Sequence, residues 1–205
     1  MAEAASTPSL QVRPLTLTGR HVTLEPLARS HAGALAEAAA DGELWRLWYT
    51  SVPPPERVRE YVDAALDMRE RTGALPFVVR ENASGTIVGS TRYFNVEPAH
   101  RRLEIGHTWY AKRVQRTGVN TDCKLLLLGH AFDTLGCIAV ELRTNFFNHA
   151  SREAIARLGA KQDGILRNHM LLPDGTRRDT VVFSILDSEW PAVRRHLRFR
   201  LERAR

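Results

Sequence analysis

The sequence predicts a single mixed α/β (α+β) domain, in which helices pack on a sheet of both parallel and antiparallel strands. Its 205 residues, 43% of them hydrophobic, suffice for one well-buried core. Apolar residues alternate in some segments and recur at three- and four-residue steps in others, and the two kinds of segment interleave along the chain. No repeat, low-complexity segment or linker divides the sequence. This order indicates one sheet covered by helices.

The first half of the chain predicts three strands and two helices. Residues 21–25 alternate between Gly19 and Pro26, which predicts the first strand, and Ser30 can cap a helix over 31–40. The elements that follow are the connector Pro53-Pro54-Pro55, an amphipathic helix over 56–71, and strands over 77–80 and 86–94 joined by the turn 82–85.

The second half predicts strands and helices in alternation, then a hairpin. The strand over 102–110 places His107 and Trp109 on one face and Glu104 and Tyr110 on the other. The elements that follow are an apolar helix over 121–135, a strand over 139–144, a helix over 150–158 ended by Gly159, and a hairpin of strands 164–172 and 178–186.

The formal charge of +6 is concentrated at the C-terminus. Residues 191–205 hold six arginines against Glu202 alone and carry +5 of that charge, so the remainder is nearly neutral. A nucleic-acid-binding surface would spread basic and aromatic residues over a folded face. We therefore expect a basic, helical C-terminal tail over 193–205, with nucleic-acid binding as the alternative to a solvated helix.

The N-terminal residues 1–10 lack the apolar segment of a signal peptide, and no apolar run approaches the roughly 20 residues of a membrane span. We expect a soluble, cytoplasmic protein without a membrane partner. Cys123 and Cys137 fall in one predicted helix, about 21 Å apart, which is too far for a disulfide. Reduced cysteines and no metal site are expected.

Residues 114–121, Val-Gln-Arg-Thr-Gly-Val-Asn-Thr, join a predicted strand to a predicted helix. Such a turn leaves the first N–H groups of the helix without intrahelical partners, close to the positive end of the helix dipole. Gly118 admits close approach of a ligand, and Asn120 and Thr121 suit a helix N-cap. The segment predicts an anion-binding loop, although many helices that bind nothing begin in the same way.

With this order of elements, the chain resembles the GNAT superfamily of acetyl-CoA-dependent N-acetyltransferases. Within it, the chain is most similar to the RimJ/RimL-type branch of ribosomal-protein N-terminal acetyltransferases and their small-molecule-modifying relatives. The resemblance covers residues 12–192. It rests on Leu103-Glu104-Ile105-Gly106, Gln115-x-x-Gly118-x-Asn120, Asn148-x-x-Ser151, Arg157-Leu158-Gly159-Ala160-Lys161-x-x-Gly164-x-Leu166-Arg167 and Arg178-Asp179-Thr180-Val181-Val182-Phe183-Ser184-Ile185.

The resemblance implies a mostly antiparallel sheet of about seven strands with helices on both faces. Its central parallel pair, 102–110 and 139–144, would splay apart, and the acetyltransferase domain would span 1–192 with 1–11 flexible. Splayed strands expose N–H and C=O groups, which the two amides of a pantetheine arm can satisfy.

The resemblance also implies acetyl-CoA as co-substrate. Its pyrophosphate would lie on backbone amides of Arg116 to Thr121, and a backbone N–H near Tyr110 or Ala111 would stabilise the oxyanion. Asn148 would hydrogen-bond the pantetheine, cap its own helix, or both. The expected cofactor-binding residues are Tyr110, Gln115, Arg116, Thr117, Gly118, Val119, Asn120, Thr121, Asn148 and Ser151.

Direct attack by an amine in a ternary complex needs a proton acceptor. Glu104 is the expected base, because alternation places it on the face of Tyr110 and partial burial raises a carboxyl pKa. The alternative is a structural ion pair with Arg102 or Arg92. His107 would face the opposite side and belong to the core, unless a twist or bulge reverses it.

The departing thiolate needs a proton or a hydrogen bond. The superfamily commonly places a Tyr on the last helix for this purpose, where this chain has Ile155. In the branch that the chain resembles, a Ser serves the thiolate, which implies Ser151. Glu104, Ser151 and Tyr110 are thus the expected catalytic residues. Asn120 also departs from the Gly or Ala usual in the superfamily.

The acceptor is expected to be a primary amine, either a small molecule or a peptide N-terminus. Trp45, Trp48 and Tyr49 lie where the family forms its acceptor wall, and with His107 they are the expected acceptor-binding residues. The alternative for the three aromatics is a hydrophobic core cluster. The Phe146-Phe147 pair suits a core, a homodimer contact or a part of the site equally well. A catalytically weak acyl-CoA-binding regulatory module remains the other class of function.

Overall fold

The computed structural model describes residues 10–203. Residues 1–9 and 204–205 lie outside that part, and with them most of the segment 1–11 that the sequence predicts to be flexible. Leu10, the first described residue, is buried. Within residues 10–203, no helix combines the length and apolar character that a membrane crossing requires.

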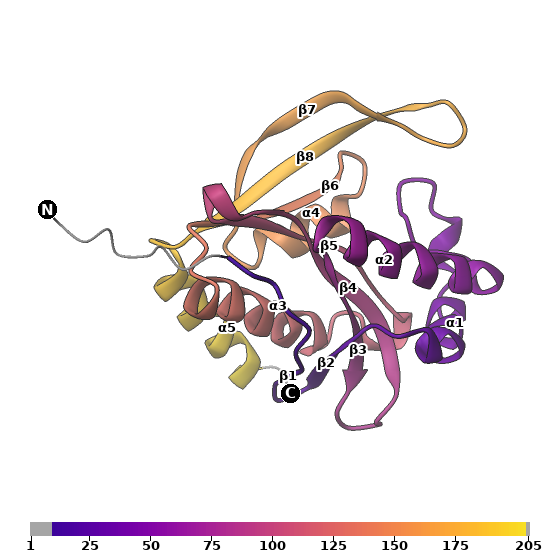
Figure 1. Cartoon of the computed structure of the whole chain (residues 1–205), viewed down its shortest axis with the longest axis horizontal. Coiled ribbons are helices and arrows are strands. Elements are labelled where there is room, and N and C mark those ends of the chain that lie inside the picture. The colour runs from indigo at the N-terminus through magenta and orange to yellow at the C-terminus, as the bar shows by residue number, and fades with distance from the viewer. Residues whose placement is uncertain (1–9, 204–205) are drawn as a thin grey trace, which may run out of the picture.

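The described chain forms one open sheet of eight strands in the order β1-β2-β3-β4-β5-β6-β8-β7 (Figure 1). Neighbouring strands run antiparallel except β5 and β6, which are parallel. The predicted mixed, mostly antiparallel fold is confirmed, with one more strand because two residues form β1. The strands are β1 Leu17–Thr18, β2 Val22–Pro26, β3 Leu75–Glu81, β4 Ile87–Glu97, β5 Arg102–Tyr110, β6 Ala139–Asn145, β7 Lys161–Leu171 and β8 Arg177–Leu186.

Helices cover both faces of the sheet, as predicted. The hydroxyl of Tyr61 on α2 donates to Ser90 Oγ on β4, whereas Tyr93, on the other face of β4, donates its hydroxyl to the carbonyl of Leu127 on α3. Helix α1 packs with α2, and α5 packs with α3. The helices are α1 Ala32–Ala40, α2 Val58–Thr72, α3 Val119–Gly129, α4 His149–Ala156 and α5 Trp190–Arg203, and a π-helical turn, His130–Thr134, follows α3.

The basic C-terminal segment is an amphipathic helix that begins before residue 193. Helix α5 buries Val193, Leu197 and Leu201, and Trp190 at its start stacks on Phe132 with 5.4 Å between the ring centroids. Most of its arginines lie on the remaining, exposed surface. Residues 193–203 therefore contribute to the hydrophobic core.

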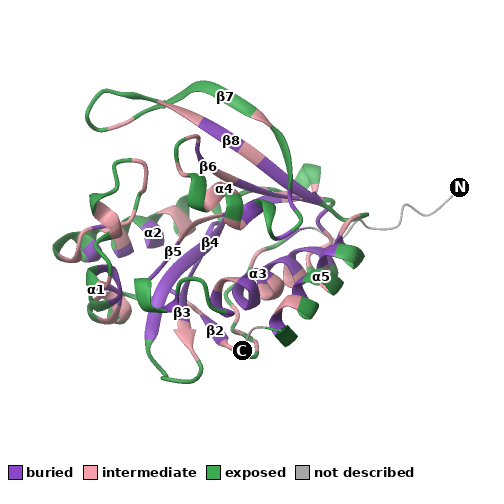
Figure 2. Ribbon diagram, turned by 180° about the vertical axis from the view of Figure 1, so that it is seen from behind, coloured by how far each residue is buried: buried purple, intermediate pink, exposed green. Residues whose placement is uncertain are grey.

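The buried centre of the sheet lies in β3, β4 and β5, while β7 is exposed along nearly its whole length (Figure 2). Asp122, only 2% exposed, fixes the start of α3 to the start of β2. Its carboxylate accepts hydrogen bonds from the backbone N–H groups of His21 at 2.6 Å and Val22 at 3.1 Å. A Cβ at Gly19 would lie 2.5 Å from Asp122 Oδ2, so glycine leaves the room that the carboxylate occupies.

Candidate functional site

A β-bulge at His107 interrupts β5. Residues 90 and 92 of β4 pair with residues 109 and 106 of β5, so one residue of β4 opposes both His107 and Thr108. His107 has a φ of 49°. The extra residue inverts the alternation of side chains beyond it. Glu104 and Tyr110 therefore lie on opposite faces of the sheet, and the expectation that they share a face is wrong.

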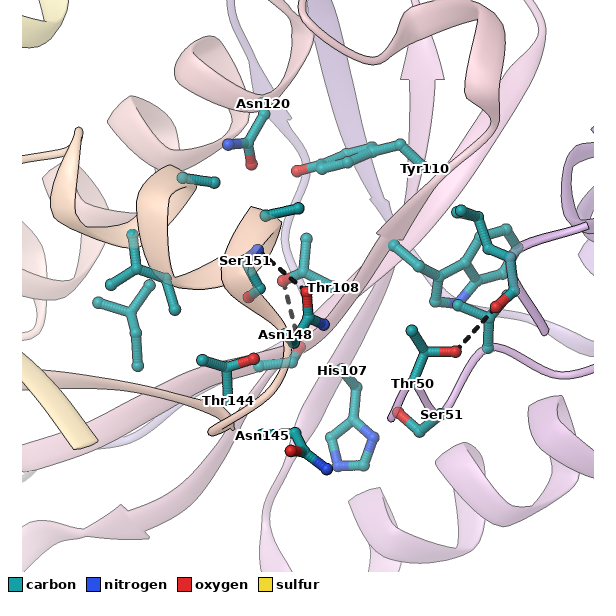
Figure 3. Close-up of a pocket in the computed structure, with 18 of the residues that line it drawn as sticks. Thr50, Ser51, His107, Thr108, Tyr110, Asn120, Thr144, Asn145, Asn148 and Ser151 are labelled. Carbon is teal, nitrogen blue, oxygen red and sulfur yellow. Dashed lines mark hydrogen bonds between the residues drawn. The ribbon is translucent and has the colours of Figure 1, made fainter. Parts of the chain in front are cut away.

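Strands β5 and β6 pair only over Arg102–Glu104 and Ala139–Glu141 and then splay apart, as predicted. A cavity of about 450 Å³ fills the gap between them (Figure 3). We call its two walls the helical side and the loop side, with His107 and Tyr110 on the floor between them. The helical side includes Asn120 and Lys124 of α3 and Asn148 and Ser151 of α4, and the loop side includes Leu44, Leu47 and residues 49–52. Arg178 of β8 also lines the cavity.

The loop before α3 presents backbone N–H groups that are free to bind a ligand. Arg116 has a φ of 62°, and the first helical N–H, that of Val119, donates to Thr117 Oγ1 at 3.3 Å. Asn120 and Thr121, the expected N-cap residues, lie instead inside the first turn, and Gly118 is the N-cap. No described residue accepts a hydrogen bond from the N–H groups of Arg116, Thr117, Gly118, Asn120 or Thr121.

The expected cofactor-binding residues of this loop divide into two groups. Gln115, Arg116 and Asn120 line the cavity, whereas the other four do not. A Cβ at Gly118 would lie 2.9 Å from the His21 ring, so this glycine allows the loop to pack against His21, just before β2. The residues that do not line the cavity are Thr117, Gly118, Val119 and Thr121.

The backbone of Tyr110 faces the gap between the splayed strands. The N–H of Ala111 donates to the carbonyl of Val88 on β4 at 2.7 Å, so it is not free for an oxyanion, and that alternative is wrong. Because successive N–H groups of a strand point to opposite sides, the N–H of Tyr110 points away from β4. Its carbonyl accepts from Gln115 Nε2 at 3.2 Å.

The side chain of Tyr110 crosses the floor toward Asn120 (Figure 3). Its hydroxyl is buried beside Cys123 and has no hydrogen-bond partner among the described residues. Burial raises the pKa of Tyr110 well above its usual value, so the phenol stays neutral.

Asn148 and Ser151 lie together on the helical side. Asn148 caps α4, because its Oδ1 accepts a hydrogen bond from the backbone N–H of Ser151 at 3.0 Å. That bond leaves the side-chain NH₂ of Asn148 and the hydroxyl of Ser151 available to a ligand, and both residues line the cavity. Ile155, one turn further along α4, supplies an apolar part of the same wall.

Glu104 lies next to the cavity but does not line it. Its Oε2 accepts from Asn95 Nδ2 at 2.9 Å and lies 3.4 Å from Nε of Arg143. Its partner is thus neither Arg102 nor Arg92. Its Oε1 lies 3.6 Å from where a Cβ would stand on Gly106, a residue of the cavity floor. Burial raises the pKa of Glu104 above its usual value, against the opposing effect of Arg143.

His107 lines the cavity because the bulge reverses the direction of its side chain. This is the alternative to the core position that alternation predicts. Its ring packs edge-on against Phe94, with 5.0 Å between the centroids, and lies near Asn145 and Ser51 (Figure 3). Burial, with added effects of Arg92 and Arg178, lowers the pKa of His107 to about 3. The imidazole is therefore neutral over the physiological range.

Lys124 is a cavity residue that sequence reasoning missed. Only 4% exposed, it extends its ammonium to Thr108 Oγ1 at 2.8 Å, and no described carboxylate forms an ion pair with it. Burial lowers the pKa of Lys124. The signal available in the sequence is its position directly before the four leucines 125–128, four residues after Asn120 and so on the same helix face.

Of the three aromatic residues expected to bind the acceptor, only one lines the cavity. Tyr49 lines the cavity, but Trp45 and Trp48 do not. Trp48 is 55% exposed and packs against Tyr49 and Phe147, with centroids 5.6 and 5.5 Å away. The indole of Trp45 is covered by the guanidinium of Arg46. Neither tryptophan lies in the hydrophobic core.

Comparisons with known proteins identify the family of this fold. The model of the acetyltransferase (GNAT) domain family matches residues 21–161. A GCN5-related N-acetyltransferase from Brucella melitensis is 30% identical, with a TM-score of 0.82 over 93% of this chain and 87% of that one.

Two further relatives are more distant. RimJ of Mycobacterium smegmatis in complex with CoA-disulfide is 22% identical, with a TM-score of 0.75 over 91% of this chain and 95% of that one, and shares the fold. The uncharacterized N-acetyltransferase YoaA of Bacillus subtilis (strain 168) is 27% identical over 100 residues, 49% of this chain and about half, 55%, of that protein. The chain belongs to the acetyltransferase (GNAT) domain family, the GCN5-related N-acetyltransferases.

Proposed function

We propose that this protein is an acetyl-CoA-dependent N-acetyltransferase that acts on a primary amine by direct attack in a ternary complex. One observation carries the proposal: the cavity between β5 and β6 ends at a loop whose backbone N–H groups have no described partner. Acetyl-CoA, when bound, supplies an activated acetyl thioester. The two walls of the cavity suit its two substrates.

The helical side suits CoA. The free N–H groups of Arg116, Thr117, Gly118, Asn120 and Thr121 favour a pyrophosphate, as does the guanidinium of Arg116. The open edges of β5 and β6 favour the two amides of a pantetheine arm. Asn148 would hydrogen-bond that arm. The M. smegmatis RimJ that shares this fold was solved with CoA-disulfide, which supports a CoA site here.

The loop side suits the amine, which would reach the thioester over His107. Glu104 is our candidate base, acting through one water over Gly106, because its Oε1 faces that residue and its raised pKa favours proton uptake. The N–H of Tyr110 would stabilise the oxyanion from the other face. Such a donor typically contributes about 3 to 4 kcal/mol to transition-state stabilisation.

The helical side would also serve the departing thiolate. The hydroxyl of Ser151 can donate a hydrogen bond to sulfur, and the ammonium of Lys124 can supply the proton, since burial already weakens its hold on that proton. The bond from Lys124 to Thr108 keeps the ammonium on the strand along which the arm would lie.

Calorimetric titration with acetyl-CoA and with free CoA tests the site, and CoA release with a panel of amines tests transfer. Asn120→Asp should weaken binding of both at least about tenfold, because it places a carboxylate beside the anion loop at nearly constant size. Gln11→Glu, the same change on the exposed N-terminal segment, is the matched control. Unchanged affinity in Asn120→Asp would reject the site. Binding without transfer to any amine would instead assign an acyl-CoA-binding regulatory module.

A further inference from the structure

Arg178 on β8 brings a charge without an ion-pair partner to the cavity wall. Among the described residues, no carboxylate lies within ion-pair distance of its guanidinium, and its Nε is buried without a hydrogen-bond partner. Its neighbour in sequence, Asp179, is held elsewhere by Arg167 Nε at 2.6 Å and by the backbone N–H of Asn168 at 2.7 Å. A buried charge left unpaired is costly, so a partner in the bound state would be favourable.

A second arginine reinforces the charge. Arg92 is 3% exposed and also forms no ion pair with a described carboxylate; it packs on the ring of Tyr61 and the sulfur of Met68. His107 on the cavity floor is close enough to both cations for each to lower its pKa, and it is neutral. Among the described residues, no aspartate or glutamate forms an ion pair with either arginine.

The nearby glutamates are already engaged. Glu141 pairs with Arg102 and with Arg143, and Glu104 takes the remaining contact with Arg143 and a hydrogen bond from Asn95. Four arginines therefore lie near two carboxylates in this region, and of the two that form no ion pair with a described carboxylate, Arg178 lines the cavity. A polycationic amine would meet repulsion here, whereas an anionic group would be attracted.

We propose that Arg178 binds a carboxylate of the acceptor, so that the substrate is a primary amine that also carries a carboxylate, as an α-amino acid does. This assignment rests on the proposed function. The planar guanidinium offers the forked pair of donors that a carboxylate accepts, and the neutral His107 beside it can contact the amine without repelling it.

The test compares L-amino acids with their α-amides as acceptors, and measures kcat/KM from CoA release. We expect the wild type to prefer the free acids, and Arg178→Gln to lower kcat/KM for the acids by about ten- to a hundredfold with little change for the amides. Arg178→Lys, which keeps the charge but not the fork, should retain part of the preference. Arg177→Gln, at the exposed adjacent position, is the control.

Calorimetry with acetyl-CoA and melting temperatures of the same variants separate the two proposals and exclude misfolding. Failure of the wild type to bind acetyl-CoA would reject the proposed function itself. Three results would overturn the carboxylate assignment alone, provided that acetyl-CoA binds. They are equal use of acids and amides, preferred use of spermidine, and no acetylation of any of these amines. A preference for peptides with an acidic second residue over free amino acids would identify a peptide as the source of the carboxylate and support it.

Discussion

The ammonium nitrogen of Lys124 lies 2.8 Å from the hydroxyl oxygen of Thr108, and this bond ties α3 to β5 beside the cavity. The hydroxyl of Thr108 also bonds to that of Thr91 at 2.8 Å, so the contact continues into β4. A buried ammonium with only hydroxyl partners is less stabilised than one paired with a carboxylate. It is correspondingly ready to give up a proton to a thiolate.

Lys124→Met should lower kcat by about a hundredfold or more while the dissociation constant of CoA changes little, because the variant removes a proton source and keeps the length of the side chain. The release of CoA during transfer to a chosen amine measures kcat, and calorimetry measures the dissociation constant of CoA. Lys112→Met, on the exposed turn after β5, serves as the control. A kcat equal to that of the wild type would remove Lys124 from the reaction.

Glu104→Gln should lower kcat and abolish the acidic limb of the pH–rate profile. The wild-type carboxylate must be ionised to act as a base, and its pKa is raised, so activity should fall as the pH drops toward that pKa from above. The profile of kcat/KM against pH measures this. A variant with reduced kcat but an unchanged acidic limb would show that Glu104 acts only by holding Arg143.

Stability should depend on pH through His107. Its folded-state pKa of about 3 lies below the usual value of about 6.5, so the unfolded chain binds a proton between these values that the folded chain does not. The contribution of His107 to the free energy of unfolding should therefore be fully present above pH 6.5. Below pH 6.5 it should fall by up to about 1.4 kcal/mol per pH unit. Urea unfolding at pH 7, 6 and 5 should show a shallower loss in His107→Gln, whereas the exposed His149→Gln should follow the wild type.

Gly118→Ala should destabilise the protein and weaken CoA binding together, because the added methyl group would lie 2.9 Å from the His21 ring behind the anion loop. We expect a loss of about 1 to 3 kcal/mol from the resulting overpacking. Gly33→Ala is the matched control, since nothing lies within 4 Å of a Cβ there and α1 should gain stability. Melting temperatures would decide, and a second change, His21→Ala, should restore part of the loss in Gly118→Ala.

Local patterns in the sequence determined most of the elements and the loop before α3. The strand from residue 102, the glycine-containing turn and the apolar helix after it depend on neighbours in sequence, so alternation and helix-start signals predict them. Asn148 caps α4 for the same local reason. The motifs of residues 103–106 and 148–151 further indicated the family that the comparisons show.

Only the tertiary structure decided which side chains share the cavity. The bulge at His107 arises from the pairing of β4 with β5, and this pairing separated Glu104 from Tyr110 and turned the histidine inward. Lys124 and Arg178 are far apart in sequence, and neither has a carboxylate partner among the described residues. That absence depends on where the surrounding carboxylates lie in the folded chain. Register and charge pairing are properties of contacts between distant segments, and a single sequence read along its length does not contain them.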